Sequence, residues 1–244
     1  MRTRELERAA AARRPVLRLA PALSSAFVAV IAEVKRASPS KGAINSSICA
    51  GPQSVAYADG GAAAISVLTE PARFGGSNAD LIDVVAASRL PVIRKDFHVE
   101  EIQLIEATSL GASAALLIVR ALAPERLLEM ARTARDLGLE ILFEIRDERE
   151  LERALRAEAT IIGVNNRNLE TLEIDSSTVL RVLPLIPHHL IAVAESGYLS
   201  AGEVERAADA GADAVLVGSI VSSSADPTKA VRALAAIPRR RRSS

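Results

Sequence analysis

The sequence predicts an α/β fold: one (β/α)8 (TIM) barrel domain with a short N-terminal helical extension. Short runs rich in Val, Ile and Leu alternate along the chain with longer stretches of helical periodicity. Near-continuous apolar strands that alternate strictly with helices require a parallel sheet whose outer face is covered by helices. The length of 244 residues is also close to the about 250 residues of a closed barrel of eight such units.

The expected strands and helices can be placed along the chain by residue number. The strands are expected at 28–32, 63–68, 92–94, 114–119, 140–143, 161–164, 190–194 and 214–217. Amphipathic helices are expected at 81–88, 99–110, 124–137, 147–157, 176–183, 200–210 and 227–236. Pro124 suits a first helical turn, and Ser200 with Glu203 has the spacing of a capping box. Gly211 follows a helix, where a left-handed residue often ends it.

An open doubly wound sheet is the competing architecture. It is disfavoured because no Gly-x-Gly-x-x-Gly motif follows the first strand, and because polar residues follow nearly every strand instead of one switch point. Before the first strand, segments 4–14 and 21–26 are expected to form a helical cap, within residues 1–26, across the bottom or the mouth of the barrel. Residues 238–244 contain four consecutive arginines and are expected to be a flexible, solvated basic tail instead of a nucleic-acid arm.

Composition narrows the class of partner. Lys and Arg number 30, as do Asp and Glu, which argues against a broad nucleic-acid or anionic-membrane surface but leaves room for a local anion pocket. Cys49 is the only cysteine, so no internal disulfide can form and a reducing cytoplasm is the simplest expectation. No apolar run approaches the about 20 residues of a membrane span.

Polar side chains follow many of the expected strands. Because the carboxyl ends of barrel strands converge above the core, these side chains are expected to build one polar site. Its charged members are the cations Lys35, Lys95 and Arg167 and the carboxylates Glu33, Glu144 and Glu195. These charges cancel in the empty protein, and they allow an anionic ligand to recruit the cations while carboxylates move protons.

The last two strands are followed by glycine-containing loops. Ser196-Gly197 follows the seventh strand and Gly218-Ser219 follows the eighth, the usual phosphate position of a barrel. Glycine lets backbone N–H groups approach an anion closely. The alternative is that both glycines only permit tight turns.

Metal binding has little support in the sequence, and no metal is expected. His188 and His189 precede the seventh strand, at the opposite face of the barrel, and no Cys/His/Asp spacing of a zinc site is present. His98 is the one histidine placed to touch a substrate.

Together these segments resemble the indole-3-glycerol phosphate synthase family, from residue 15 to residue 234. The matching segments are IAEVKRASPSKG at 31–42, AISVLTE at 64–70, FGGS at 74–77, RKDF at 94–97, Glu144, GVNNRNL at 163–169, AESG at 194–197 and VGS at 217–219. The resemblance implies a lyase of tryptophan biosynthesis. Its substrate would be 1-(2-carboxyphenylamino)-1-deoxyribulose 5-phosphate, and its products indole-3-glycerol phosphate, carbon dioxide and water.

The resemblance also implies roles for the catalytic side chains. Lys95 would be the general acid of ring closure, and Glu144 the base of a later step. Glu33 and Asn165 would orient and stabilise, and Lys35 would act in dehydration or hold the substrate's anionic groups. No metal or organic cofactor is implied, because the substrate's own ring donates the electrons.

Further residues would bind the substrate, again by resemblance. Ser38 and Arg167 would position the carboxylate, while Phe97 with Leu116 or Leu117 would form an apolar wall for the aromatic ring. Glu195 would anchor ribulose hydroxyls or lysines. The remaining contacts are assigned to Ser196 and, for the phosphate, to Lys35, Gly197, Gly218 and Ser219.

Some features depart from the family pattern and leave alternatives open. The N-terminal extension looks short, His98 begins a more polar stretch than usual, and Tyr198 stands where a small aliphatic residue is common. The alternatives are a paralogue acting on a related indole precursor and a non-catalytic phosphate-binding barrel. The second is disfavoured because a pure binder gains nothing from Lys95, Glu144 and Glu33 together. The chain is expected to be a monomer or a weak homodimer in the cytoplasm.

Overall fold

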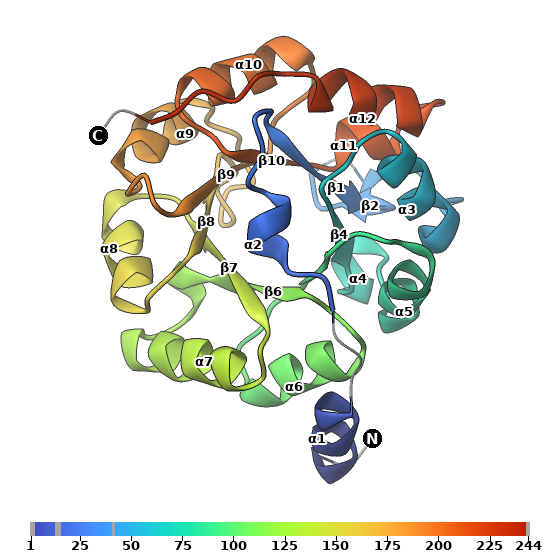
Figure 1. Ribbon diagram of the computed structural model, residues 1–244, viewed down its shortest axis with the longest axis vertical. Helices are drawn as coiled ribbons and strands as arrows, with labels where there is room; N and C mark the ends of the chain where they lie inside the picture. The colour runs from blue at the N-terminus through green and yellow to red at the C-terminus, as the bar shows by residue number, and fades with distance from the viewer. Residues whose placement is uncertain (1–2, 13–15, 41, 243–244) are drawn as a thin grey trace.

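The computed structural model describes residues 3–12, 16–40 and 42–242. Eight parallel strands close into a barrel in the order β1-β10-β9-β8-β7-β6-β5-β4, which confirms the expected (β/α)8 fold (Figure 1). The barrel strands are β1 (Ala29–Val34), β4 (Ala64–Leu68), β5 (Val92–Lys95), β6 (Ala114–Ile118), β7 (Glu140–Ile145), β8 (Ile161–Asn165), β9 (Ile191–Glu195) and β10 (Ala214–Val217). A small antiparallel pair, β2 (Ala37–Ser38) and β3 (Gly42–Ala43), follows β1.

Helices surround the barrel on its outside, as Figure 1 shows. The ring contains α3 (Ala50–Asp59), α5 (Asn78–Ala87), α6 (Glu101–Ser109), α7 (Pro124–Asp136), α8 (Glu148–Arg156), α9 (Ser177–Val182), α10 (Ala201–Asp209) and α12 (Pro227–Ala235). Shorter helical turns are α4 (Pro71–Phe74), η1 (Val119–Ala121), η2 (Leu183–Leu185) and α11 (Ser219–Ser222). The capping box of Ser200 and Glu203 is present at α10. The described helices are all too short or too polar to cross a membrane.

Helix α3 was not expected from the sequence. Its buried face is made of Ala50, Gly51, Ser54 and Tyr57, so the segment lacks the stripe of large apolar residues that marks an amphipathic helix. Pro52 lies in the first turn, where a missing N–H costs no helical hydrogen bond.

The N-terminal extension covers the amino-terminal end, or bottom, of the barrel. In Figure 1, α2 (Leu19–Ala22) lies over the centre of the ring of strands. Leu19 is fully buried in the inner core, and the backbone N–H groups of Leu19 and Ala20 donate to the carboxylate of Glu140, the first residue of β7. Helix α1 (Thr3–Ala11) packs beside α6. Residues 1, 2 and 13–15 of the expected cap lie outside the described part.

The C-terminal segment also packs against the bottom of the barrel, so the expectation of a solvated tail is wrong for two of its arginines. Arg242 donates to the backbone carbonyls of Leu190 and Gly211, and its side chain is only 4% exposed. The carboxylate of Asp213 receives both Arg242, at 2.8 Å, and Arg239, at 3.1 Å. Residues 243 and 244 lie outside the described part.

Side chains alternate along each strand between two cores. The inner core, inside the barrel, contains Ile31, Ile93, Leu142 and Val193, whereas the outer core lies between strands and helices. Because strand side chains have a period of two, the next inward positions toward the carboxyl end follow directly. They are occupied by Glu33, Lys95, Glu144 and Glu195. The pattern that fills the barrel therefore also delivers the charged site.

Candidate active site

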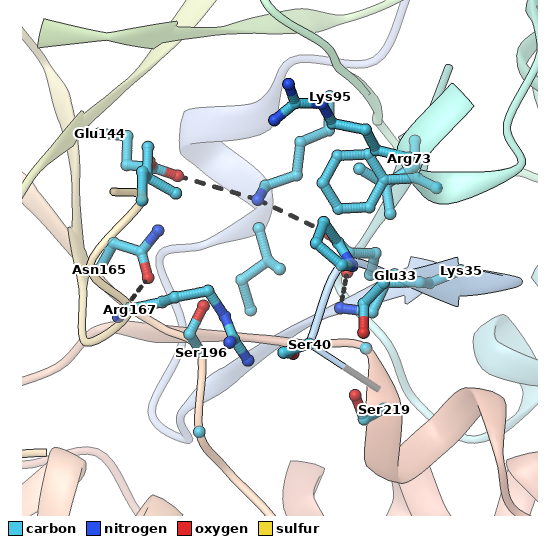
Figure 2. A pocket seen from close by; sticks show the side chains of 18 of the residues that line it. Glu33, Lys35, Ser40, Arg73, Lys95, Glu144, Asn165, Arg167, Ser196 and Ser219 are labelled. Carbon is cyan, nitrogen blue, oxygen red and sulfur yellow. Dashed lines mark hydrogen bonds and ion pairs between the residues drawn. The ribbon is translucent and has the colours of Figure 1, made fainter. Parts of the chain in front are cut away.

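One pocket opens at the carboxyl ends of the barrel strands (Figure 2). Of the residues expected from sequence to form the site, all line this pocket except Glu195, His98 and the alternative Leu117. The expected residues in the lining are Glu33, Lys35, Ser38, Lys95, Phe97, Leu116, Glu144, Asn165, Arg167, Ser196, Gly197, Gly218 and Ser219. Residues far apart in the sequence thus meet at one mouth, as the strand-end argument predicted.

Lys95 lies among three buried carboxylates. Its Nζ atom is 3.8 Å from Glu33 Oε2, 3.8 Å from Glu144 Oε2 and 3.7 Å from Glu195 Oε2. Burial alone would lower the pKa of Lys95, but the attraction of the three carboxylates outweighs it and raises that pKa above its ordinary value. Lys95 therefore carries a proton at neutral pH.

The backbone that presents Lys95 is fixed by its neighbours, which point away from the barrel interior. Arg94 is buried; its guanidinium lies 2.7 Å from Glu106 on α6 and donates to Thr69 Oγ1 at 3.2 Å. Thr69 in turn donates to Asp96 at 2.5 Å. These bonds join the ends of β4 and β5 to α6, so the strand end that carries Lys95 is held from outside.

Glu195 lies beneath the pocket lining, fully buried. Neither of its carboxyl oxygens makes a hydrogen bond with the described residues. Burial raises the pKa of Glu195 to about 8, with repulsion from Glu144 adding to the effect and Lys95 opposing it. Of the two roles expected for Glu195, this geometry favours contact with a lysine over contact with the substrate.

Glu33 and Lys35 form a close ion pair at the end of β1, with Oε1 and Nζ 2.9 Å apart. Burial would raise the pKa of Glu33, but Lys35 and Lys95 together lower it below its ordinary value. The pair fits against Gly218, where a Cβ atom would lie 2.5 Å from Glu33 Oε1 and 3.1 Å from Lys35 Nζ. The absent side chain of Gly218 therefore leaves room for the ion pair.

Two arginines line the pocket without a carboxylate partner among the described residues. Arg167 donates from Nη1 to Leu172 O at 2.7 Å and from its backbone N–H to Asn165 Oδ1 at 2.9 Å. Burial lowers the pKa of Arg167 below its ordinary value. The other arginine is Arg73 on α4, a helix that Glu70 caps by accepting from the backbone N–H of Arg73. Both cations are available to an anionic ligand.

The two glycine loops after β9 and β10 face the pocket. Ser196 has a φ of 65° and Gly197 a φ of 87°. A left-handed residue other than glycine is strained, and such strain is found most often at functional sites. A Cβ at Gly197 would lie 2.8 Å from Ile174 Cγ2, so this glycine is required both by its backbone conformation and by space.

An apolar wall closes one side of the pocket. Phe97 is 40% exposed at the mouth, and its ring centroid is 6.4 Å from that of Phe74. Of the two leucines expected from sequence, Leu116 lines the pocket, whereas Leu117 points into the outer core. His98 does not line the pocket: it is buried behind it, with Nδ1 2.9 Å from Leu116 O.

Several lining residues were not expected from sequence. They are Pro39, Ser40, Leu68, Glu70, Arg73, Phe74, Asp96, Ile118, Leu169, Leu172, Ile174, Tyr198, Leu199, Leu216 and Val217. Eight of them, among them Ser40 and Phe74, lie within the segments that carry the family resemblance, but no role was expected for them. Arg73 could have been considered, because it directly precedes the FGGS segment that did attract attention. No group of three His, Cys, Asp or Glu within the described ranges could hold a metal ion.

A barrel with these loops and charges defines a class: a (β/α)8 enzyme for a small anionic substrate. The chain matches the family model described as indole-3-glycerol phosphate synthase over residues 1–234. It therefore belongs to the indole-3-glycerol phosphate synthase family of carbon–carbon lyases.

Relatives and solved structures agree with this assignment. Indole-3-glycerol phosphate synthase 1 of Streptomyces coelicolor is 50% identical over 95% of this chain and 86% of its own length. The synthase of Mycobacterium avium is 48% identical over 93% and 84%. A 3-hexulose-6-phosphate synthase from Salmonella typhimurium has a TM-score of 0.68 at 15% identity, covering 85% of this chain and 97% of its own. That last likeness supports the fold alone.

Proposed function

We propose that this chain converts 1-(2-carboxyphenylamino)-1-deoxyribulose 5-phosphate into indole-3-glycerol phosphate, carbon dioxide and water in tryptophan biosynthesis. Family membership supports the reaction. The observation that carries the chemistry is the Lys95 ammonium, which lies among three glutamates in a pocket that also contains Arg167 and the glycine loops after β9 and β10. The pocket thus combines a proton donor with binding sites for the carboxylate and the phosphate of the substrate.

Lys95 is the general acid of ring closure. The aromatic carbon that bears the carboxylate attacks the ketone carbon, and the ketone oxygen takes the Lys95 proton as the new carbon–carbon bond forms. A raised pKa keeps Lys95 protonated until that moment. The acid can be weak because the acceptor is a developing alkoxide, which is more basic than an amine, and the nearby ammonium also stabilises its charge.

The later steps need a base and a second acid. Loss of carbon dioxide restores the aromaticity of the six-membered ring. The five-membered ring made in the first step still carries its hydroxyl group. Water then leaves: Glu144 takes a proton from the ring methylene, and Lys35 protonates the departing hydroxyl. The 2.9 Å ion pair holds Lys35 beside Glu33, and Asn165 lies in the same lining to orient the intermediate.

The anionic ends of the substrate bind at different parts of the mouth. Ser38 and Arg167 hold the carboxylate, and Phe97 with Leu116 contacts the aromatic ring. The phosphate binds to the loops after β9 and β10, at Ser196, Gly197, Gly218 and Ser219, with Lys35 nearby. All of these residues line the pocket, and each belongs to the same chain.

Turnover can be tested directly by adding the carboxyphenylamino-deoxyribulose phosphate and following indole fluorescence. We expect indole-3-glycerol phosphate to accumulate. Binding without product would favour the non-catalytic barrel, and turnover only of a related indole precursor would favour the paralogue. Either result would contradict the proposal.

We further propose that the enzyme works in the cytoplasm as a monomer or weak homodimer. Support comes from the unpaired, exposed Cys49 and from a site formed within one chain. Light scattering across a range of concentrations would detect a stable dimer, and a stable dimer would contradict the proposed oligomeric state.

A further inference from the structure

Gly163 occupies an inward position on β8, in the layer just below the charged site. Two residues earlier, Ile161 belongs to the inner core, so the side chain missing at 163 would also point into the barrel. A Cβ atom there would lie 1.9 Å from Glu195 Oε1 and 3.2 Å from Leu142 Cδ1. Glu195 therefore occupies the space that a side chain at position 163 would fill.

Position 163 requires glycine because there is no space for a side chain, and not because of the backbone conformation. Gly163 lies within a regular strand that pairs with β7 and β9, and its φ is not positive. Glu195 stands opposite Asn165 in the register, so its side chain leans back along β8 toward position 163. From there, Oε2 reaches to 3.7 Å from Lys95 Nζ.

We propose that Gly163 is a positioning residue, which makes the space for the Glu195 carboxyl group and through it sets the position of Lys95. The inference rests on the proposed role of Lys95 as general acid. Gly163 does not line the pocket, so its effect is transmitted through Glu195 and not through the substrate. In contrast, Gly218 lines the pocket itself, and its substitution would also change the phosphate loop.

The expected displacement is large on the scale of catalysis. Relieving a 1.9 Å contact to an ordinary van der Waals distance moves the carboxyl oxygen by more than about 1 Å. Glu195 is fully buried, so the movement is taken up inside the charged cluster. A misplacement of about 1 Å can lower an enzyme's rate about 100-fold.

The test is a double-substitution cycle with Gly163→Ala and Glu195→Ala. We expect Gly163→Ala to lower kcat about 100-fold while KM stays within about threefold, because the displaced group does not touch substrate. In the Glu195→Ala background, Gly163→Ala should cause no further loss. Gly202→Ala on α10, where a Cβ would meet no atom within 4 Å, is the matched control and should leave kcat unchanged.

Two outcomes would overturn the proposal: an unchanged kcat in Gly163→Ala, or losses that multiply in the double variant. Thermal unfolding provides a second readout that does not need turnover. Gly163→Ala should lower Tm in the presence of Glu195 and much less in its absence; equal losses would also overturn the proposal. If the parent chain lacked turnover while this Tm coupling held, the proposed function would fail and the positioning role of Gly163 would stand.

Discussion

His98 makes the stability of the protein depend on pH between about pH 4 and about pH 6.5. Its side chain is buried behind the apolar wall of the pocket, with Nδ1 2.9 Å from Leu116 O. Burial lowers the pKa of His98 to about 4, with the Arg94 cation adding to the effect and with Asp96 and Glu106 opposing it. In the unfolded chain this pKa is about 6.5.

The sign follows from which state binds more protons. Between pH 6.5 and 4 the unfolded chain protonates His98 while the folded protein does not, so acidification favours unfolding. The contribution is near zero above pH 7, costs about 2 kcal/mol by pH 5, and approaches about 3 kcal/mol below pH 4.

His98→Asn isolates this contribution, because the Asn amide can still donate to Leu116 O while it cannot titrate. Urea unfolding of both proteins at pH 7.5 and pH 5 gives the difference in free energy of unfolding at each pH. The variant should be less stable at pH 7.5, since the smaller side chain leaves a cavity. On moving to pH 5, however, the parent should lose about 2 kcal/mol more than the variant. Equal losses in the two proteins would refute the reasoning, whatever other groups titrate.

Three further substitutions test the site and the C-terminal segment. Lys95→Met should lower kcat at least about 1000-fold while substrate still binds in a fluorescence titration, and unchanged turnover would refute its acid role. Ser219→Ala should raise KM about fivefold with little change in kcat, as expected for one lost phosphate hydrogen bond of about 1 kcal/mol; an effect confined to kcat would contradict that assignment. Arg242→Ala removes buried bonds to Asp213 and should lower Tm by about 5 °C without changing kcat, whereas Arg241→Ala, exposed on the same segment, should not.

The barrel could be predicted from the sequence because its signals are local and repeated. Apolar runs and capping patterns such as Ser200 with Glu203 each identify one element, and their alternation fixes the architecture. Helix α3 was not predicted because its buried face consists of small residues, with Tyr57 as the only large one. The contacts of the C-terminal arginines were not predicted because Asp213, which binds Arg239 and Arg242, lies immediately before β10 and becomes their partner only after folding.

The sequence predicted which side chains lie together at the carboxyl ends of the strands, but not how deeply each one is buried. All the strand-end residues expected there except Glu195 line the pocket, because parallel strands in a barrel end at one face. Sequence could not show that Glu195 lies below the lining while Glu144 lies in it, since that depends on which neighbouring strand leaves space. Arg73 was not predicted for a different reason. It lies on α4, a short helix capped by Glu70 and followed by Gly75, and the position of this helix beside the pocket could not be predicted from the sequence.

Missing side chains matter as much to this site as the charged ones. Three glutamate side chains share a buried space with the Lys95 ammonium, and the surrounding backbone limits where each of them can lie. Gly163 and Gly218 stand at inward positions of β8 and directly after β10, and a Cβ at either would contact a glutamate oxygen. The two glycines thus set where the carboxylates can lie, and the carboxylates set where Lys95 and Lys35 can lie. The arrangement of the acids and bases is therefore determined one layer below the groups that would meet the substrate.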